Sequence, residues 1–492
     1  MKYIGISAGF HDAALSVIDE HGNLLFAGHN ERYSRIKHDS DIGLELVQDA
    51  MQYVNDDYEL HYYERPYYRY LRQLYAGQKP KLSSLSPRSN LSRGASQLLK
   101  GKINTHSHHL CHAAAGFQTS PFQEATVVIV DSIGEFDTVS IWYAYYDGDH
   151  YAKYKKLYSK KYPNSLGLFY SALTQRVGLK PNEEEYITMG MAAYGEDIHY
   201  GQMWGDFVEN GYNLEFKENL HLGFPENYLP DADIMDLAKS GQLLLECILQ
   251  NVLTRAAVLS DSKNLVYGGG VALNCLANRL IGGNFNNTWI FPNPGDAGSA
   301  VGASALGYRK RINFTNCYLG HVIEGTYPVD NALDCLLRDR IVGVASGKAE
   351  FGPRSLGNRS LLADPRGPDI KDKVNEIKRR QKFRPFAPVI LEEYAHKYFD
   401  MPKGWSNSRY MQTVARCKNP DLFPAIVHHD GTSRVQTVPK DGSGIRELLE
   451  KWYVLTECPM LLNTSLNIKG EPMVNNIDDA KRFETLYDIK VL

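Results

Sequence analysis

The first thirty residues, "MKYIGISAGFHDAALSVIDEHGNLLFAGHN" (1–30), contain three short apolar runs separated by polar turns. Residues 2–7, 13–19 and 24–30 alternate in the manner of β-strands, and the "EHGN" between the last two runs is typical of a tight turn. The stretch therefore predicts a strand, a polar loop and a β-hairpin.

The same plan returns about 120 residues later. "ATVVIVD" (125–131) is an apolar strand that ends in Asp131, and residues 138–146 and 151–158 flank the turn "DGDH". A strand, loop and hairpin that occur twice are typical of the actin/sugar-kinase/Hsp70 ATPase architecture, in which the two loops face each other across a nucleotide cleft. We therefore expect a duplicated α/β fold of this kind, although hairpins are common and the repeat alone leaves other folds open.

The later sequence predicts helices and a second domain. Residues 165–178 and 234–258 have helical spacing, while residues 264–281 and 289–308 both read as a strand, a glycine turn and a helix. After residue 335 the composition shifts towards Arg, Asn and Pro. We expect a first domain over residues 1–320 and a second over residues 335–492.

Composition narrows the class of protein. A chain of 492 residues is too long for one ordinary core, and 43% apolar with 23% charged residues is typical of a globular protein. No run of 18 apolar residues occurs, so no membrane span is expected. The seven dispersed cysteines include no CxxC pair, and the N-terminus has no apolar secretory segment, which predicts a reducing, cytoplasmic compartment.

Four histidines crowd into "HSHHLCH" (106–112). His108 and His112 are four residues apart, so on a helix they share one face, as two imidazole ligands of a metal ion would. Asp131 and Asp296 would supply carboxylates if the duplicated architecture is right. A solvated helix start is the alternative, and it is the interpretation we give His106 and His109.

Two further motifs lie in predicted turns. Gly268, Gly269 and Gly270 follow a strand and open a helix, where glycine lets the backbone approach a phosphate or ribose. His11 and Asp12 lie in the first polar loop, where a histidine beside a carboxylate can act as a general base. A tight structural turn explains each motif equally simply.

The C-terminal domain gathers arginines in loops: Arg354, Arg359, Arg384 and Arg434. These residues stand beside glycine and proline, and a guanidinium fork fits phosphate oxygens. "LLNTSLNIKGEP" (461–472) adds Asn463, Thr464 and Ser465 after an apolar strand. The pattern predicts an anion site in the second domain, with solvated arginines as the alternative.

Together these motifs resemble the O-carbamoyltransferases of the nodulation-factor and tobramycin type. The matching stretches run nearly from end to end, and they include "FHDAALSVI", "ERYSRIKH", "HHLCHAAAGF", "DSIGE", "MGMAAYGE", "GGGVALN", "NPGDAGSAVGA", "FGPRSLGNRSLLADPR", "FRPFAPVI", "DGTSRVQTV" and "LLNTSLNIKGEP". The resemblance implies an N-terminal domain like the tRNA threonylcarbamoyladenosine transferases and a C-terminal YrdC-like domain. It also implies two steps: carbamoyl phosphate and ATP give carbamoyl-adenylate, from which an acceptor hydroxyl takes the carbamoyl group.

The resemblance assigns roles to particular residues. A divalent metal, with Fe²⁺ the expected ion, would be held by His108, His112, Asp131 and Asp296, and His11 would be the base. The adenosine would be contacted by Gly134, Glu135, Gly270 and Asn274. Carbamoyl phosphate and ATP, with its Mg²⁺, would be bound by Arg354, Arg384, Arg434, Asn463 and Ser465.

The acceptor stays open. The acceptor could be a sugar-type small molecule or a hydroxymethylated base in nucleic acid. The second interpretation rests on the segment from Tyr62 to Lys102, which is rich in Tyr, Lys and Arg. A solvent-facing loop is the simpler interpretation of that segment. A tRNA threonylcarbamoyl transferase and an inactive scaffold on the same fold are further alternatives. The chain would act on its own or as a homodimer, and no membrane partner is expected.

Overall fold

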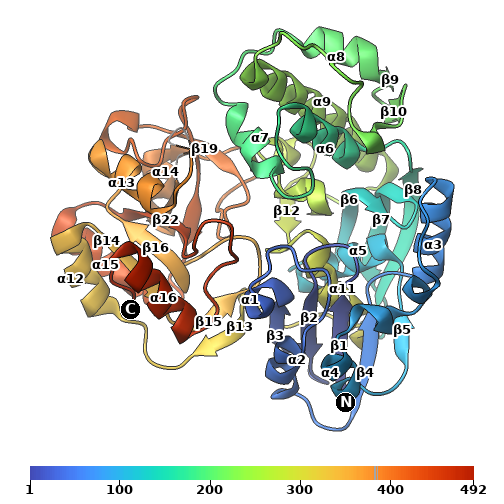
Figure 1. Ribbon diagram of the computed structural model, residues 1–492, viewed down its shortest axis with the longest axis horizontal. Coiled ribbons are helices and arrows are strands. Elements are labelled where there is room, and N and C mark those ends of the chain that lie inside the picture. Colours follow the sequence, from blue (N-terminus) through green and yellow to red (C-terminus); the bar gives the residue numbers. More distant parts are fainter. Residues whose placement is uncertain (382–383, 385) are drawn as a thin grey trace. The chain divides into compact units, whose positions relative to one another are not determined.

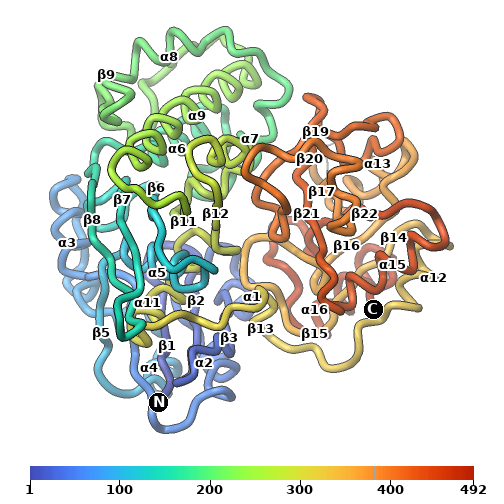
Figure 2. The backbone as a smooth tube through the Cα atoms, turned by 180° about the vertical axis from the view of Figure 1, so that it is seen from behind, coloured from blue at the N-terminus to red at the C-terminus, as the bar shows by residue number. Residues whose placement is uncertain are grey.

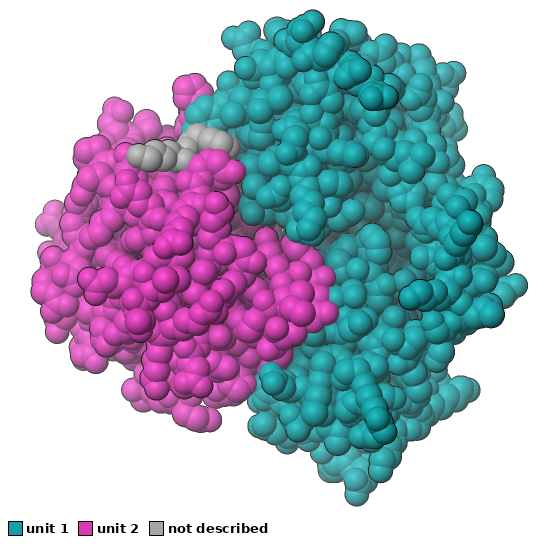
Figure 3. Space-filling view, viewed as in Figure 1, with its two compact units in different colours: residues 1–30, 40–315 teal, residues 31–39, 316–492 magenta. Residues whose placement is uncertain are grey.

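The computed structural model describes every residue of the chain except Lys382, Phe383 and Pro385. It forms two compact units, residues 1–30 with 40–315 (unit 1) and residues 31–39 with 316–492 (unit 2), coloured separately in Figure 3. Unit 2 therefore includes a short segment from the N-terminal region as well as the C-terminal third of the chain. Nothing in the sequence pattern indicated that crossing.

The first sheet of unit 1 has five strands in the order β3-β2-β1-β4-β5. β1 (Lys2–Ser7), β2 (Ala14–Ile18) and β3 (Leu24–His29) form the predicted antiparallel meander. β4 (Tyr58–Tyr62) and β5 (Ile103–Thr105) run parallel to β1. The polar loop that carries His11 thus leaves the carboxyl end of a central strand.

The second sheet repeats this topology. β6 (Glu124–Gly134), β7 (Asp137–Tyr146) and β8 (Ala152–Lys161) form an antiparallel meander, and β11 (Asn264–Gly268) and β12 (Asn287–Ile290) run parallel to β6. The order β8-β7-β6-β11-β12 matches that of the first sheet. The predicted duplication is confirmed, and unit 1 is a mixed α/β fold of the actin-like ATPase type.

Two helices rich in small residues lie between the sheets (Figure 1). α5 (His108–Thr119) packs on β6 and β11, and α11 (Ser299–Tyr308) packs on β1 and β2. Their backbones touch because a glycine stands at the crossing, where a Cβ on Gly302 would lie only 1.8 Å from the carbonyl oxygen of Cys111. This close packing brings the first turn of α5 to the turn that precedes α11.

α9 (Ile234–Leu259) is the one helix among the described residues that is long and apolar enough to cross a membrane. Half of its apolar window is buried inside the protein. It packs against α6 (Leu166–Arg176), α7 (Glu185–Met191) and α8 (Tyr200–Phe207), in the helical layer at the top of Figure 2. This is the packing of a core helix.

The remaining elements of unit 1 are short: α2 (Leu44–Met51), α3 (Pro66–Tyr75), α4 (Arg93–Leu98), β9 (Val208–Asn210), β10 (Glu215–Phe216) and α10 (Cys275–Asn278). The helix predicted after the glycine turn is one of these fragments. It divides into a 3₁₀ turn (Gly270–Leu273) and α10, because Asn274 between them is extended and caps α10 through the backbone N–H of Ala277.

Unit 2 is built on a five-stranded sheet in the order β14-β16-β22-β17-β21. These strands are β14 (Ile341–Ala345), β16 (Arg359–Ala363), β22 (Met460–Ser465), β17 (Ala387–Leu391) and β21 (Gln436–Val438). Beside it lie the pair β13 (Tyr318–Ile323) and β15 (Gly347–Glu350), and the group β18 (Phe399–Asp400), β19 (Val414–Cys417) and β20 (Thr432–Arg434). The helices are α1 (Asn30–Ser34), α12 (Val329–Asp339), α13 (Asp369–Ile377), α14 (Ala395–Tyr398), α15 (Gly444–Thr456) and α16 (Ile477–Tyr487).

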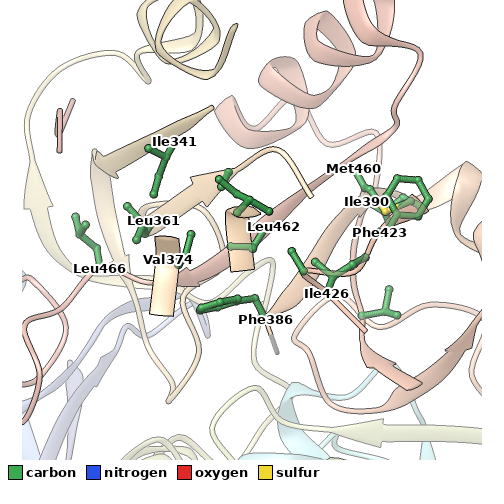
Figure 4. Close-up of a cluster of buried hydrophobic side chains, with 14 of the residues drawn as sticks. Ile341, Leu361, Val374, Phe386, Ile390, Phe423, Ile426, Met460, Leu462 and Leu466 are labelled. Atoms are coloured by element: carbon green, nitrogen blue, oxygen red, sulfur yellow. The ribbon is translucent and has the colours of Figure 1, made fainter. Parts of the chain in front are cut away.

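This sheet is covered on both faces. Leu361, Ile390 and Leu462 point into one core with Val374 of α13 (Figure 4). The same core includes Phe483 of α16. Their strand neighbours Leu362 and Leu461 point into the other core, against α12 and α15. The period of two in side-chain direction explains why these strands read as continuous apolar runs in the sequence.

Candidate metal centre and active site

Four side chains converge at the junction of α5, β6 and the turn before α11. His108 Nε2 lies 3.1 Å from Asp131 Oδ2 and 3.3 Å from Asp296 Oδ1, and His112 Nε2 lies 3.3 Å from Asp296 Oδ1. One ligand atom from each residue falls within 4.8 Å of all the others, and all four side chains are almost entirely buried. The structure thus brings together the four residues that the sequence nominated from three distant segments.

The cluster combines two histidines whose pKa is raised with two aspartates whose pKa is lowered. Burial alone would lower the pKa of the two histidines, but the carboxylates outweigh it and hold the pKa of His108 well above, and that of His112 above, the ordinary value. Burial would raise the pKa of Asp131 and Asp296, yet the histidines hold both below the usual range. Positively charged histidines and negatively charged aspartates are therefore buried side by side at this site.

The donor set fits a divalent transition metal. The Nε2 atoms of His108 and His112 lie 3.1 Å apart, so at most one of them can carry a hydrogen directed at the other. A single cation would satisfy both nitrogen lone pairs and both carboxylates, and two imidazoles with two carboxylates are ligands that zinc and iron accept. His108 Nδ1 has no hydrogen-bond partner among the described residues, and Glu64 Oε1 is 3.9 Å away.

The buried carboxylate of Glu64 is a part of this site that sequence reasoning missed. It follows β4 by two residues and lies inside the segment from Tyr62 to Lys102, and nothing in its local sequence distinguishes it. Its pKa is raised, first by burial and partly by Glu135 and Asp296, although Arg69 and His108 oppose this. A carboxylate so placed can orient the His108 ring.

His11 lies within the field of the cluster. Its Nδ1 is 2.9 Å from Asp12 Oδ2, and Asp12 holds a left-handed backbone conformation with φ 52°. Burial works against the charged imidazole, but the hydrogen bond to Asp12 and the charges of Asp296 and Asp131 raise the pKa of His11 to about 9. A cation bound between the two aspartates would cancel much of that field and bring the pKa towards neutrality.

The residues expected to contact adenosine divide into two groups. Gly270 and Gly134 touch the metal cluster itself: the Gly270 N–H donates to Asp131 Oδ1 at 3.0 Å, and a Cβ on Gly134 would lie 2.5 Å from the rings of His108 and His109. These glycines let the backbone approach the four-residue cluster closely, and their place beside an adenosine stays a prediction.

The other two members are engaged by protein groups. Glu135 accepts the backbone N–H and the Nε–H of Arg65, both at 3.0 Å. Asn274 exchanges hydrogen bonds with Gln242, at 2.9 and 3.1 Å, in a buried amide network. Nothing in these contacts brings Asn274 to the metal cluster, and its place beside a nucleotide stays a prediction.

In unit 2, Arg354 lies on a loop that Glu350 holds in shape. The carboxylate Oε1 of Glu350 accepts the backbone N–H groups of Leu356, Asn358 and Arg359 at 2.7, 2.9 and 3.2 Å. Asn463 supports the same loop, because its buried amide nitrogen donates to the carbonyl oxygen of Ser355 at 3.1 Å and to Gln436 at 2.8 Å. In this arrangement Asn463 positions the loop, and direct contact with a phosphate would cost one of these bonds.

Arg359 does not belong with the anion-binding arginines. It is completely buried, and its guanidinium donates to the carbonyl oxygens of Ser346, Gly347, His321, Asn358 and Asn475. Burial lowers its pKa to about 10. The expectation placed it with Arg354 because the two share a loop motif, but the strand pairing of β16 turns its side chain into the protein.

Lys378 is a buried lysine that the sequence analysis did not single out, and it contacts Ser465, one of the predicted phosphate ligands. Lys378 Nζ lies 2.6 Å from the carbonyl oxygen of Ser465 and 3.3 Å from its Oγ, and it also contacts Asn467. Burial holds the pKa of Lys378 well below its ordinary value, and the nearby charges of Arg380 and Arg384 add to the shift. In the sequence, the sign of this site is the cationic run "KRRQKFR" (378–384), from which the prediction used only Arg384.

Arg434 borders this cationic group. Together with Lys371 and Arg380, it contributes to the low pKa of His428, which is about 4 mainly because of burial. The structure therefore places Ser465 in contact with Lys378, while Arg384 acts on Lys378, and Arg434 on His428, through its charge. Phe383 and Pro385 of the "FRPFAPVI" motif lie outside the described residues.

Comparison with known proteins bears on both units. A family model described as Carbamoyltransferase N-terminus matches residues 94–305, and one described as Carbamoyltransferase C-terminus matches residues 333–492. The first range contains all four residues of the metal cluster, and the second contains the cationic group around Lys378.

Several curated proteins are similar over most of their length. An uncharacterised protein of Synechocystis sp. is 30% identical, with 97% of this chain and 93% of the relative covered. Nodulation protein NolO of Bradyrhizobium diazoefficiens is 33% identical, with 76% and 75% covered, and nodulation protein NolNO of Sinorhizobium fredii is 30% identical, with 96% and 76% covered.

Among solved structures, the activator of the 2-hydroxyisocaproyl-CoA dehydratase from Clostridium difficile with bound ADPNP aligns with 63% of this chain and 94% of its own, at 12% identity and a TM-score of 0.32. The fold assignment therefore rests on the strand order of the two sheets. The family assignment rests on the two matched models and on the relatives. They show that this chain belongs to the carbamoyltransferase family and is a transferase enzyme.

Proposed function

We propose that the protein is an ATP-dependent O-carbamoyltransferase that works in two steps. In the first, water cleaves carbamoyl phosphate to carbamate and inorganic phosphate, and a carbamate oxygen then attacks the α-phosphorus of ATP, which gives carbamoyl-adenylate and releases pyrophosphate. In the second, an acceptor hydroxyl attacks the carbamoyl carbon and AMP leaves. Family membership supports carbamoyl transfer. The two steps are those that the family resemblance implies, and the presence of two chemically different sites supports that division.

Unit 2, which we take to be YrdC-like, suits the first step. Burial lowers the pKa of Lys378, and the positive charges of Arg380 and Arg384 lower it further. A polyphosphate would supply the missing negative charge. Arg354, on its braced loop, and Arg434 would complete the binding of carbamoyl phosphate and ATP, the latter with Mg²⁺.

Unit 1 suits the second step, and the convergence of His108, His112, Asp131 and Asp296 is the observation that carries the proposal. A divalent cation held there, Fe²⁺ by the family resemblance, would supply a Lewis acid that stabilises negative charge on the adenylate. His11, oriented by Asp12, would take the proton from the attacking hydroxyl. Gly134, Glu135, Gly270 and Asn274 would line the adenosine.

The two sites make the proposal testable with one variant. His112→Ala removes a ligand and leaves unit 2 untouched, so it should lose bound metal and slow transfer by 100-fold or more, while pyrophosphate release from ATP and carbamoyl phosphate continues. Metal content is read by elemental analysis, and transfer by a mass gain of one carbamoyl group on a panel of hydroxyl acceptors.

His150→Ala is the matched control, because His150 is an exposed histidine of the same unit. It should keep metal and both steps. Normal metal content and transfer in His112→Ala would remove the ligand assignment, and a wild-type protein that releases no pyrophosphate with both substrates would remove the adenylate step.

A further inference from the structure

Helix α3 of unit 1 has its apolar side turned to solvent. Its exposed residues are Tyr67, Tyr68, Leu71, Leu74 and Tyr75, with Tyr67 and Tyr75 more than half exposed at 61% and 69%. Its arginines point inward instead: Arg69 donates to the carbonyl oxygen of Gly9 and pairs with Glu64, and Arg72 is buried. A helix on an unliganded surface normally has the opposite arrangement.

The surroundings of α3 extend this face and make it cationic. The 3₁₀ turn Leu82–Leu85 packs on α3 and exposes Leu82 at 74%. Residues 65–102 contain nine Lys or Arg and no Asp or Glu. Five of these cations are exposed and form no ion pair with any described residue: Lys79, Lys81, Arg93, Lys100 and Lys102.

Packing and a hydrogen bond connect these pieces. The turn Leu82–Leu85 also packs on the next turn, Pro87–Asn90. Arg88 from that turn donates to the carbonyl oxygen of Leu99 at 2.9 Å, which places the loop with Lys100 and Lys102 beside it. We call the exposed residues of α3, of the turn Leu82–Leu85 and of the five cations the α3 face.

The α3 face begins at the proposed transfer site. Glu64, two residues before α3, lies 3.9 Å from His108, and Arg65 pairs with Glu135 while its guanidinium stands 4.0 Å over the Tyr68 ring. At the other end of the helix, the Tyr75 ring contacts Phe136, from the same turn as Glu135. An acceptor whose hydroxyl enters the site would therefore run out along α3.

We propose that the α3 face binds single-stranded nucleic acid and that the carbamoyl acceptor is a hydroxyl on a nucleotide of that strand. Exposed tyrosines stack on bases of any sequence, and unpaired lysines neutralise phosphates. The helix is about 15 Å long, enough for a few nucleotides beside the one that enters the site. This inference rests on the proposed function, which it deepens by naming the class of acceptor.

Charge and position favour single-stranded nucleic acid over the two other ligands that could cover an apolar face, a second copy of the chain and a lipid bilayer. A symmetric dimer through the α3 face would place its five unpaired cations against the same five of the second copy. A bilayer would have to take up the Arg65–Glu135 pair at the edge of the face. A polynucleotide brings stacking surface and negative charge together.

The test is binding of a fluorescent 12-nucleotide single strand to the full-length protein at increasing salt, followed by anisotropy. Wild type should bind at low salt, and its affinity should fall with a log–log slope of about −0.7 for each phosphate contacted. Tyr67→Ala/Tyr75→Ala should bind at least about tenfold more weakly, as expected when stacking is lost. Lys79→Glu/Lys81→Glu should reduce both the affinity and the slope.

Lys263→Glu/Lys403→Glu makes the same charge change at exposed sites outside the α3 face and should bind as wild type does. All variants should keep pyrophosphate release from ATP and carbamoyl phosphate, so a loss there would count against the proposed function and not against this inference. Absence of salt-dependent binding by wild type would overturn the inference. So would unchanged binding by the tyrosine variant, or tyrosine-dependent binding to phosphatidylserine vesicles without binding to the strand.

Discussion

His108 and His112 show how much of this site depends on single atoms. Both rings present Nε2 to the same point, and each is within 3.3 Å of Asp296. The helical spacing turns the neighbouring His109 away from this point. Its Nδ1 forms a hydrogen bond with Ser140 Oγ at 2.8 Å. Burial lowers the pKa of His109 to about 3. One residue of register thus separates a predicted metal ligand from a neutral core histidine, and the solvated position that we expected for His109 is wrong.

Asp12 should set the pH at which transfer begins. Its carboxylate raises the pKa of His11, and a base must be neutral to accept a proton, so transfer rises with pH through that pKa. Asp12→Asn removes the charge and keeps a residue that tolerates the left-handed backbone at position 12. We expect the acid limb of the rate profile to move about one unit or more towards lower pH.

The measurement is the rate of carbamoyl transfer from pH 5 to 9 with saturating ATP and carbamoyl phosphate. Pyrophosphate release by unit 2 serves as the internal control and should keep its own profile. An acid limb that stays in place in Asp12→Asn would show that His11 is not the group that titrates.

At the scale of elements, the segment 31–39 braces the anion site of unit 2. Arg32 is buried and donates to the carbonyl oxygens of Glu350 and Gly352, on either side of the start of the Arg354 loop. Arg35 donates to the carbonyl oxygens of Pro472 and Met473, which follow the Asn463–Ser465 strand. Two arginines from the N-terminal region therefore hold the Arg354 loop and the segment that follows the strand with Asn463 and Ser465.

Arg32→Lys should loosen the Arg354 loop while keeping the charge. A lysine cannot serve both carbonyl groups as the guanidinium fork does, and a buried acceptor left unpaired costs about 1–3 kcal/mol. We expect the KM for carbamoyl phosphate to rise about tenfold or more in the pyrophosphate assay, with metal content unchanged. Arg338→Lys, at an exposed arginine of the same unit, is the control. A wild-type KM in Arg32→Lys would mean that the loop holds its shape without this contact.

The elements of unit 1 were predictable where their patterns repeat. Both meanders were recognised from alternating strands and turn residues. His11 was nominated by the first polar loop, Asp131 by the end of its apolar strand, and Asp296 by the tight turn "NPGDAGSA" (293–300). The segment 31–39 was not, because Arg32 is buried through hydrogen bonds and not through an apolar pattern. Lys378 was missed for the same reason: a cationic run normally lies in solvent, and only the fold turns one member inward.

At the scale of the whole molecule, buried histidines divide into two populations with opposite responses to pH. Burial lowers the pKa of His61, His106 and His428 to about 4 and that of His109 to about 3. The field of the aspartates raises the pKa of His11, His108 and His112. The histidines of the first population are still neutral in the folded protein at a pH at which they are already protonated in the unfolded chain. The histidines of the second population are still protonated in the folded protein at a pH at which they have lost the proton in the unfolded chain.

The chelator-treated protein should therefore be most stable near pH 6.5. Below that value the unfolded chain binds protons that the four low-pKa histidines refuse, so the free energy of unfolding falls as the pH drops towards 4. Above it, the stabilisation from His11, His108 and His112 is lost as the pH rises towards 9. Each group that titrates in only one state contributes up to about 1.4 kcal/mol per pH unit.

Urea unfolding at pH 5, 6.5 and 8.5, with and without the metal restored, separates the two populations. Metal binding needs neutral His108 and His112, so the loss of stability on the alkaline side should shrink when metal is present, while the loss on the acid side persists. His428→Gln should reduce the acid slope, and His150→Gln, at an exposed histidine whose environment is open to water, should leave it unchanged. A free energy of unfolding that is flat between pH 5 and 8.5 in the chelated protein would contradict both assignments at once.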